Sequence, residues 1–149
     1  WIDFPREGNN WSYKYARRQW SLLDNPELKY QYLGEFDRMM IRVIKENSVM
    51  SSLFGNQLNV DEMNKTIAFE RNNLVFLFNF HPANSIPDYR FRVHKAGEYE
   101  IILNSDDLAF GGHGRIDDSI SYFTSNENGA EFLNVYNTNR TALVFKRVV

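Results

Sequence analysis

The sequence predicts a mainly β protein, an antiparallel β-sandwich preceded by a loop and one long amphipathic helix. Three observations lead to this fold class. Apolar residues recur at helical spacing between residues 26 and 46. Past Asn47 the hydrophobic period changes to two, and short apolar runs separated by Asn, Asp, Gly and Pro continue to the end of the chain. About six to eight short strands at such intervals are typical of a sandwich or barrel.

The first 20 residues follow no amphipathic period and carry Trp and Tyr rings among arginines and amides. Rings cover the C–H faces of sugars, and guanidinium and amide groups bond sugar hydroxyls, so this composition suits a loop that binds a neutral polyhydroxyl ligand. The alternative is that these residues only pin a long connection onto its own domain. Because the segment starts abruptly and without Met, we expect it to be cut from a larger protein.

A helix is predicted to start at about Pro26 and to run to about Glu46. Asp24-Asn25-Pro26-Glu27 combines a capping acceptor, a first-turn proline and a Glu three residues after Asp24. The apolar stripe comprises Leu28, Tyr32, Phe36, Met39, Met40, Val43 and Ile44. Such a stripe must be buried against another element, and the paired methionines are interpreted as gap-filling core.

The clearest strands form a hairpin, in which residues 66–71 and 74–80 flank an Asn72-Asn73 turn. Asparagine tolerates the positive φ that a two-residue hairpin turn requires. Pro82 and Pro87 are expected to bracket a loop, and Ala96-Gly97 a turn. Further strands are predicted at residues 89–93, 99–103, 119–123, 131–136 and 141–147.

The second strand of this hairpin is apolar on both faces. Leu74, Phe76, Phe78 and Phe80 point one way, whereas Val75 and Leu77 point the other. Both faces therefore need a cover. The opposite sheet would cover one face, and the helix of residues 26–46 the other.

Composition excludes several classes of function. A net charge of -2 with both signs interspersed offers no continuous positive face for nucleic acid. No run approaches the roughly 18 apolar residues of a membrane span. Without cysteine there is no disulfide framework and no thiolate site, and a cytosolic setting is the default.

Two carboxylate pairs are candidates for glycoside chemistry, which uses two acids flanking a sugar bond. Asp106-Asp107 and Asp117-Asp118 both lie in the polar loop of residues 104–118. Aspartates in such loops commonly cap turns through the backbone, and we favour this structural role.

Other motifs are weak. The glycines of the same loop follow no strand-to-helix phosphate pattern. His81, His94 and His113 lack metal-ligand spacing, and we favour surface or hydrogen-bonded roles for all three, although His113 between glycines could face a ligand. The residues alone therefore predict no active site, no metal and no cofactor.

Eight blocks of sequence occur in the same order in a known family. They are Trp1–Asn10, Tyr15–Trp20, Ile67–Arg71, Phe78–Pro82, Asp88–Arg90, Leu103–Asp107, Phe110–His113 and Arg140–Leu143. On these blocks the chain resembles the 1,4-α-glucan (glycogen or starch) branching enzymes of the α-amylase superfamily, and it looks most similar to their eukaryotic-type branch.

The resemblance implies two parts. Residues 1–50 would be the loop after the eighth strand and the last helix of a catalytic (β/α)8 barrel, and residues 51–149 the all-β C-terminal sandwich domain. In this family the complete enzyme cleaves an α-1,4 linkage with retention and transfers the cut chain to a 6-hydroxyl, in glycogen biosynthesis. Its catalytic carboxylates belong to earlier strands whose motifs this chain lacks. We therefore expect the chain to be non-catalytic and to stabilise the barrel.

The same resemblance implies a glucan-contacting loop, because barrel active sites are built from loops at the carboxyl ends of the strands. The expected partners are an α-glucan (glycogen, starch or a maltooligosaccharide) and the rest of the barrel. The candidate substrate-binding residues are Trp1, Arg6, Asn10, Trp11, Tyr13, Arg17 and Arg18. For Arg17 and Arg18 a scaffold role is favoured, since their guanidinium groups can tie the loop to neighbouring acids.

A freestanding glucan-binding module is the alternative, with the aromatic residues forming a sugar platform. A sandwich fold does not discriminate between the two. If the chain is the end of a larger enzyme, apolar surface on the helix and first loop should be exposed. Such surface would leave the segment before about Pro26 displaced or disordered, or would drive a dimer.

Overall fold

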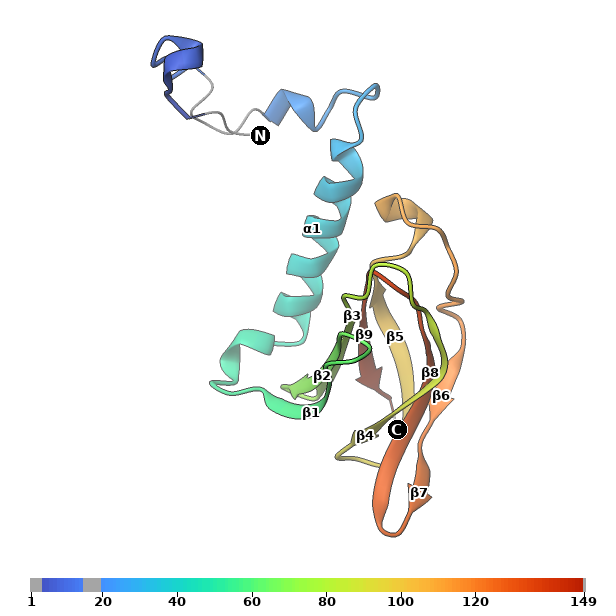
Figure 1. The fold of residues 1–149 in the computed structure, drawn as a ribbon. Coiled ribbons are helices and arrows are strands. Elements are labelled where there is room, and N and C mark those ends of the chain that lie inside the picture. Colours follow the sequence, from blue (N-terminus) through green and yellow to red (C-terminus); the bar gives the residue numbers. More distant parts are fainter. Residues whose placement is uncertain (1–3, 15–19, 149) are drawn as a thin grey trace.

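The computed structural model describes residues 4–14 and 20–148, which form one α-helix and two antiparallel sheets (Figure 1). Helix α1 spans Tyr30–Glu46. Short 3-10 helices η1, η2, η3 and η4 occupy Glu7–Asn9, Trp20–Leu22, Val49–Ser51 and Leu108–Phe110. The predicted fold class, a mainly β antiparallel sandwich preceded by a loop and a helix, is confirmed.

The two sheets face each other across the main core. The larger sheet has the order β1-β2-β3-β9-β5-β6, and the smaller has the order β4-β8-β7. The strands of the larger sheet are β1 (Asn56–Asp61), β2 (Thr66–Arg71), β3 (Leu74–Asn79), β9 (Thr141–Arg147), β5 (Glu98–Asn104) and β6 (Ser121–Phe123). Those of the smaller sheet are β4 (Ile86–Val93), β8 (Ala130–Asn137) and β7 (Ser125–Glu127).

The predicted hairpin is β2–β3. Its antiparallel register runs from Thr66 opposite Asn79 to Arg71 opposite Leu74. Asn72 and Asn73 adopt φ values of 47° and 64°, so both turn residues are left-handed, as a tight hairpin with the natural strand twist requires.

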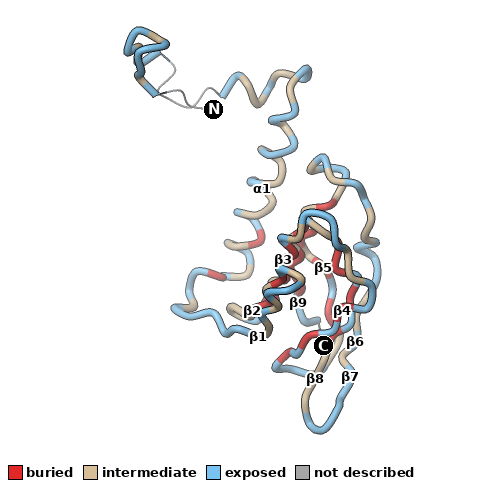
Figure 2. The backbone as a smooth tube through the Cα atoms, in the orientation of Figure 1, coloured by how far each residue is buried: buried red, intermediate tan, exposed pale blue. Residues whose placement is uncertain are grey.

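Strand β3 is covered on both faces, as predicted. Val75 and Leu77 belong to the core between the sheets, together with Phe91, Leu133 and Phe145. On the other face Leu74 belongs to a second cluster that includes helix residues. Figure 2 shows buried positions on the strands and on the side of α1 that faces them. The second cluster contains Val43, Val49, Leu74, Leu103 and Val144, with Phe36, Met39, Met40, Ile44, Phe76, Ile102 and Phe110 packed against it.

The predicted start of the helix is wrong by four residues. The Asn25 side chain accepts a hydrogen bond from the Glu27 N–H (3.0 Å), and the Asn25 carbonyl accepts one from the Leu28 N–H (3.1 Å). The local turn thus satisfies donors that the predicted helix would have used. The helix begins only at Tyr30, near the point where the Tyr32 ring contacts Gly111. Its end at Glu46 agrees with the prediction.

Strand boundaries differ from the predicted ones where polar residues or proline interrupt the apolar alternation. Pro87, expected in a loop, lies inside edge strand β4 at a register shift where Asp88 has a φ of 51°. A bulge on an edge strand tolerates a residue without an N–H. Polar strands β1 and β7 were not predicted individually, because β1 carries only two apolar residues, Leu58 and Val60, and β7 carries none.

Helix α1 is apolar around more than half of its circumference. Val43 faces the sheet and is buried, whereas Leu33 and Ile41 are 52% and 42% exposed. Arg38 and Arg42 lie in the remaining arc, whereas Asp37 interrupts the apolar arc between Ile44 and Ile41. The predicted exposed apolar surface on this helix is therefore confirmed. A stripe this wide suits a helix with two neighbours, of which the sandwich supplies one.

A row of stacked phenylalanine rings lies on the outer face of β2–β3. Phe69 stacks on Phe76 and Phe78 at centroid distances of 4.9 and 6.0 Å, and Phe78 stacks on Phe80 at 5.7 Å. Phe80 is mostly exposed, and so are Met50, Leu53 and Phe54 on the connection between α1 and β1. The outer face of the larger sheet thus continues as apolar surface beyond the area that α1 covers.

A matched pair of leucine truncations tests the assigned core. Leu77 is fully buried between the sheets, whereas Leu53 is 86% exposed. We expect Leu77→Ala to lower the free energy of unfolding by about 2–5 kcal/mol, because it leaves a cavity. Leu53→Ala should change it by less than about 0.5 kcal/mol. Chemical denaturation measures both, and equal losses would contradict the packing.

Candidate functional site

The predicted ligand loop is partly described. Arg6, Asn10, Trp11 and Tyr13 lie in residues 4–14, whereas Trp1, Arg17 and Arg18 lie outside the described residues. Figure 1 shows the described part beyond the N-terminal end of α1, away from the sheets.

A tight turn organises this loop. The Arg6 carbonyl accepts the N–H groups of Asn9 (3.1 Å) and Trp11 (2.9 Å), and the Asn9 side chain accepts the Arg6 N–H (2.9 Å). Asn10 and Trp11 are left-handed, with φ of 53° and 55°. The turn brings Arg6 and Trp11 together and leaves the rings of Trp11 and Tyr13 65% and 79% exposed.

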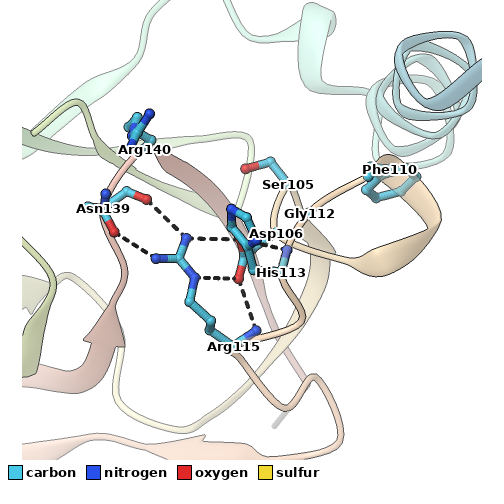
Figure 3. Close-up of a pocket in the computed structure, with 9 residues that line it drawn as sticks. Ser105, Asp106, Phe110, Gly112, His113, Arg115, Asn139 and Arg140 are labelled. Atoms are coloured by element: carbon cyan, nitrogen blue, oxygen red, sulfur yellow. Dashed lines mark hydrogen bonds and ion pairs between the residues drawn. The ribbon is translucent and has the colours of Figure 1, made fainter. Parts of the chain in front are cut away.

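A polar cavity lies elsewhere, beside the loop of residues 104–118 (Figure 3). It has a volume of about 400 Å³. Its lining residues are Ser105, Asp106, Phe110, Gly111, Gly112, His113, Arg115, Asn139 and Arg140. A second cavity of about 290 Å³ is lined by Glu70, Asn73, Val75, Lys95, Tyr99 and Arg147. Neither cavity is lined by a predicted substrate-binding residue.

Asp106 organises the floor of the larger cavity. Its Oδ1 accepts hydrogen bonds from the His113 N–H (3.2 Å) and Arg115 Nη2 (2.9 Å). Its Oδ2 accepts two from Arg115, from the backbone N–H and from Nε, both at 3.0 Å. Four donors therefore hold one carboxylate that is 3% exposed. Buried charges are stable only when paired and hydrogen-bonded in this way.

Arg115 extends the network to the β8–β9 turn. Its Nη1 donates to Asn139 Oδ1 (2.6 Å), and its Nη2 donates to the Asn139 carbonyl (3.1 Å). Asn139 in turn donates from its side chain to the Pro82 carbonyl (2.9 Å) and from its backbone to Ser85 Oγ (3.1 Å). The Asp106–Arg115 pair thus joins three loops that are distant in sequence.

Glycine makes the close turn of this loop possible. A Cβ at Gly112 would overlap the backbone of Asp106, and Gly111 has a φ of 74° that side chains rarely adopt. The loop can therefore fold back over Asp106 only with glycine at these positions.

The environment fixes the charge state of the pair. Burial by itself would raise the pKa of Asp106, but the Arg115 side chain and the N–H groups of Arg115 and His113 hold that pKa below its ordinary value. Hydrogen bonding to Asp106 raises the pKa of Arg115. Both groups stay ionised at neutral pH, so Asp106 has no proton to donate as an acid.

The other carboxylates have the structural roles that we favoured. Asp107 accepts the Ala109 N–H and caps η4 (2.8 Å). Asp117 accepts the backbone N–H and hydroxyl of Ser119, and Asp118 accepts from the Asn104 amide. Asp106 is the only acid among the residues that line the larger cavity. A retaining glycosidase needs two carboxyl groups about 5–5.5 Å apart, which this cavity does not provide.

Two of the three histidines have clear structural roles. His81 Nδ1 accepts the N–H groups of Ala83 and Asn84, and His94 bonds Glu70 at 2.6 Å. His113 is exposed at the cavity. Among the described residues no group of three or more His, Asp or Glu is arranged to hold a metal ion. Within the same residues, α1 is too short and too polar to cross a lipid bilayer, and so is every other helix.

Sequence reasoning did not find the Asp106–Arg115 pair or its link to Asn139. The pairing depends on glycine turns within the loop and on a contact between residues 24 positions apart. The available signals were the dense glycines of the loop and Arg115 beside them, but neither specifies a partner.

Removing the Asp106 charge should destabilise the fold in a pH-dependent way. We expect Asp106→Asn to lower the free energy of unfolding by about 3 kcal/mol at pH 7, because Arg115 is left without its partner. Since the folded-state pKa of Asp106 is depressed, its contribution is complete above the unfolded value of about 3.9 and is lost as the pH falls through the folded value.

The difference in the free energy of unfolding between the wild-type chain and Asp106→Asn should therefore shrink as the pH falls below about 4. Denaturation curves recorded from pH 7 to pH 2 measure it. Asp117→Asn is the matched control, because Asp117 is exposed and only caps a turn. It should lower the free energy of unfolding much less than Asp106→Asn does. A constant difference at all pH values would contradict the ion-pair assignment.

Comparison with known proteins agrees with this architecture. The family model described as the alpha amylase C-terminal all-beta domain matches residues 58–148. The 1,4-alpha-glucan-branching enzyme of Saccharomyces cerevisiae is 50% identical over 147 residues, which are 97% of this chain and 21% of that protein. The chloroplastic/amyloplastic 1,4-alpha-glucan-branching enzyme of Oryza sativa subsp. japonica is 48% identical over 127 residues, 85% of this chain and 16% of that protein.

A third relative, the 1,4-alpha-glucan-branching enzyme of Rhizophagus irregularis, is 45% identical over 147 residues, 97% of this chain and 22% of that protein. The chain thus spans about a fifth of the length of these relatives. Its family match covers most of the residues from β1 to β9. The chain therefore belongs to the alpha amylase C-terminal all-beta domain family.

Proposed function

We propose that this chain is the non-catalytic C-terminal part of a 1,4-α-glucan branching enzyme, in which it stabilises the catalytic barrel. The observation that carries the proposal is the two-sided apolar surface of α1. One side packs on the sandwich, and the other exposes Leu33 and Ile41. Exposed apolar surface of this extent is typical of an interface.

The same helix suggests how the chain is divided into two parts. Residues 1–50 are proposed to complete a (β/α)8 barrel as its last loop and last helix, and residues 51–149 to form the C-terminal domain. The barrel would cover the exposed side of α1, while the sandwich covers the side that includes Val43. The apolar surface around Phe80 and Phe54 would extend the same interface.

The parent activity is proposed from the relatives. The complete enzyme would cleave α-1,4 linkages of glycogen, starch or a maltooligosaccharide and form α-1,6 linkages by chain transfer, in glycogen biosynthesis. Each of the two cavities described above is lined by a single acid, Asp106 in one and Glu70 in the other, which supports a non-catalytic role. A cytoplasmic parent is proposed from the absence of cysteine.

The glucan contacts are also proposals. Arg6, Asn10, Trp11 and Tyr13, with Trp1, Arg17 and Arg18, would lie beside the substrate face of the barrel. The exposure of the Trp11 and Tyr13 rings is compatible with stacking on sugar. Without the barrel, the exposed side of α1, which carries Leu33 and Ile41 and is called its open side below, would favour a dimer of the chain.

Substitutions on the open side of α1 test the barrel interface. The relevant protein is a chimaera in which this chain replaces the corresponding C-terminal part of the S. cerevisiae relative. We expect Leu33→Gln with Ile41→Gln to weaken the chimaera by about 2 kcal/mol per side chain, lowering its melting temperature and its branching activity. The stability of the isolated chain, measured as a monomer at low protein concentration, should change by less than about 0.5 kcal/mol, because both residues are exposed in it.

Arg38→Gln with Arg42→Gln is the matched control on the polar side of the same helix, where both arginines form exposed ion pairs. This control should leave the chimaera unchanged. An equal effect of the two double variants, or an effect confined to the isolated chain, would count against the interface.

A freestanding glucan-binding module is the second candidate, favoured by the exposed rings of Trp11 and Tyr13. Titration with maltoheptaose under tryptophan fluorescence separates the two functions. The scaffold proposal predicts no saturable change at millimolar sugar. A saturable change that Trp11→Ala abolishes and Trp20→Ala preserves would instead support the module.

A further inference from the structure

The cavity beside the loop of residues 104–118 has a closed polar floor. All four hydrogen bonds that the Asp106 carboxylate accepts come from Arg115 and His113. The Arg115 guanidinium donates to Asp106 and Asn139. The backbone N–H groups of Gly111, Gly112 and Gly114 donate to carbonyls within the same loop. None of these groups is left to bind a ligand.

The groups that remain at the cavity are one cation and two side chains that can donate hydrogen bonds. Arg140 is exposed, and its guanidinium has no partner among the hydrogen bonds and ion pairs of the described residues. Ser105 Oγ accepts the Ala142 N–H (2.8 Å), which leaves its own hydrogen to donate. The His113 ring is exposed and can donate from a ring nitrogen. Figure 3 shows Asn139 and Arg140 on one side of the cavity and the loop residues on the other.

The charge of the cavity is positive. Asp106 and Arg115 neutralise each other, and no second acid lines the cavity, so the charge of Arg140 is uncompensated. The backbone of Arg140 is left-handed in the β8–β9 turn, with a φ of 55°, and its side chain is exposed at the cavity. In the same turn Thr141 Oγ1 donates to the Thr138 carbonyl (2.6 Å).

A neutral sugar fits this lining poorly. Sugar hydroxyls need acceptors as well as donors, and the one carboxylate here is saturated. The only phenylalanine, tyrosine or tryptophan ring in the lining is that of Phe110. It packs edge-on against Phe36 with centroids 5.4 Å apart, so it is already engaged with the helix. An oxyanion, which only accepts hydrogen bonds, matches the donors that remain.

We propose that this cavity binds a phosphate group, held by the Arg140 guanidinium with support from the Ser105 hydroxyl and the His113 ring. Guanidinium binds phosphate oxygens in a bidentate geometry. The volume of about 400 Å³ lies in the range of small-molecule sites, about 300–1,000 Å³, and leaves room for a phosphate ester of a sugar. This site does not depend on the proposed function, since it is complete within the chain.

Titration of the 149-residue chain with three probes tests the site. Backbone amide NMR shifts are followed while inorganic phosphate, glucose 6-phosphate or glucose is added, with sodium chloride keeping the ionic strength constant. Saturable shifts at Ser105, His113 and Arg140 are expected with the first two probes and not with glucose. Tighter binding of glucose 6-phosphate identifies an ester site, and equal binding identifies a site for the free anion. Both results support the proposal.

Variants assign the binding to Arg140. We expect Arg140→Gln to weaken phosphate binding at least about tenfold, and Arg140→Lys to keep part of it, because charge is retained without the planar fork. Arg92→Gln is the control, since Arg92 is an exposed arginine on the outer face of β4 and lines neither cavity. The amide spectra also report whether each variant is folded.

Three results would overturn the proposal. They are shifts that rise without saturation and match those from chloride, unchanged binding in Arg140→Gln, and glucose binding as tight as that of its phosphate ester.

Discussion

The structure depends on strand β3, whose two faces are both apolar. On one face Val75 and Leu77 pack in the core between the sheets, and on the other Leu74 packs in the cluster formed with α1. A strand of this kind is unstable at the surface of a two-layer sandwich, because one oily face would meet water. The helix is therefore a third layer that the sandwich requires. The segment that precedes Tyr30 starts from the N-terminal end of this helix.

Local patterns predicted the elements that local interactions specify. The β2–β3 hairpin and the end of α1 agree with prediction, because the Asn72-Asn73 turn and the helical stripe carry their own signals. The start of α1 did not agree, since the Asn25 side chain formed a turn with Glu27 in competition with the helix. The Asp106–Arg115–Asn139 network could not be predicted, because it arises only when the β8–β9 turn folds against the glycine loop.

The same contrast separates the two surfaces of functional interest. Exposed apolar surface on α1 was predicted from the family resemblance, because the helix would lose its neighbours in the rest of a larger enzyme. The polar cavity was not, since Ser105 and His113 belong to the loop of residues 104–118 and Arg140 to the β8–β9 turn, and the approach of these two segments depends on Asp106. One surface is apolar and extended, as a protein partner requires, and the other is small and positively charged, as an anion requires.

The central functional claim is that this chain supports glucan branching without catalysing it. The most direct measurement incubates the isolated chain with amylose and follows the anomeric proton signal of α-1,6 linkages by NMR, beside the chimaera with the S. cerevisiae relative. New α-1,6 linkages are expected with the chimaera and none with the chain alone. Their appearance with the chain alone would contradict the non-catalytic role.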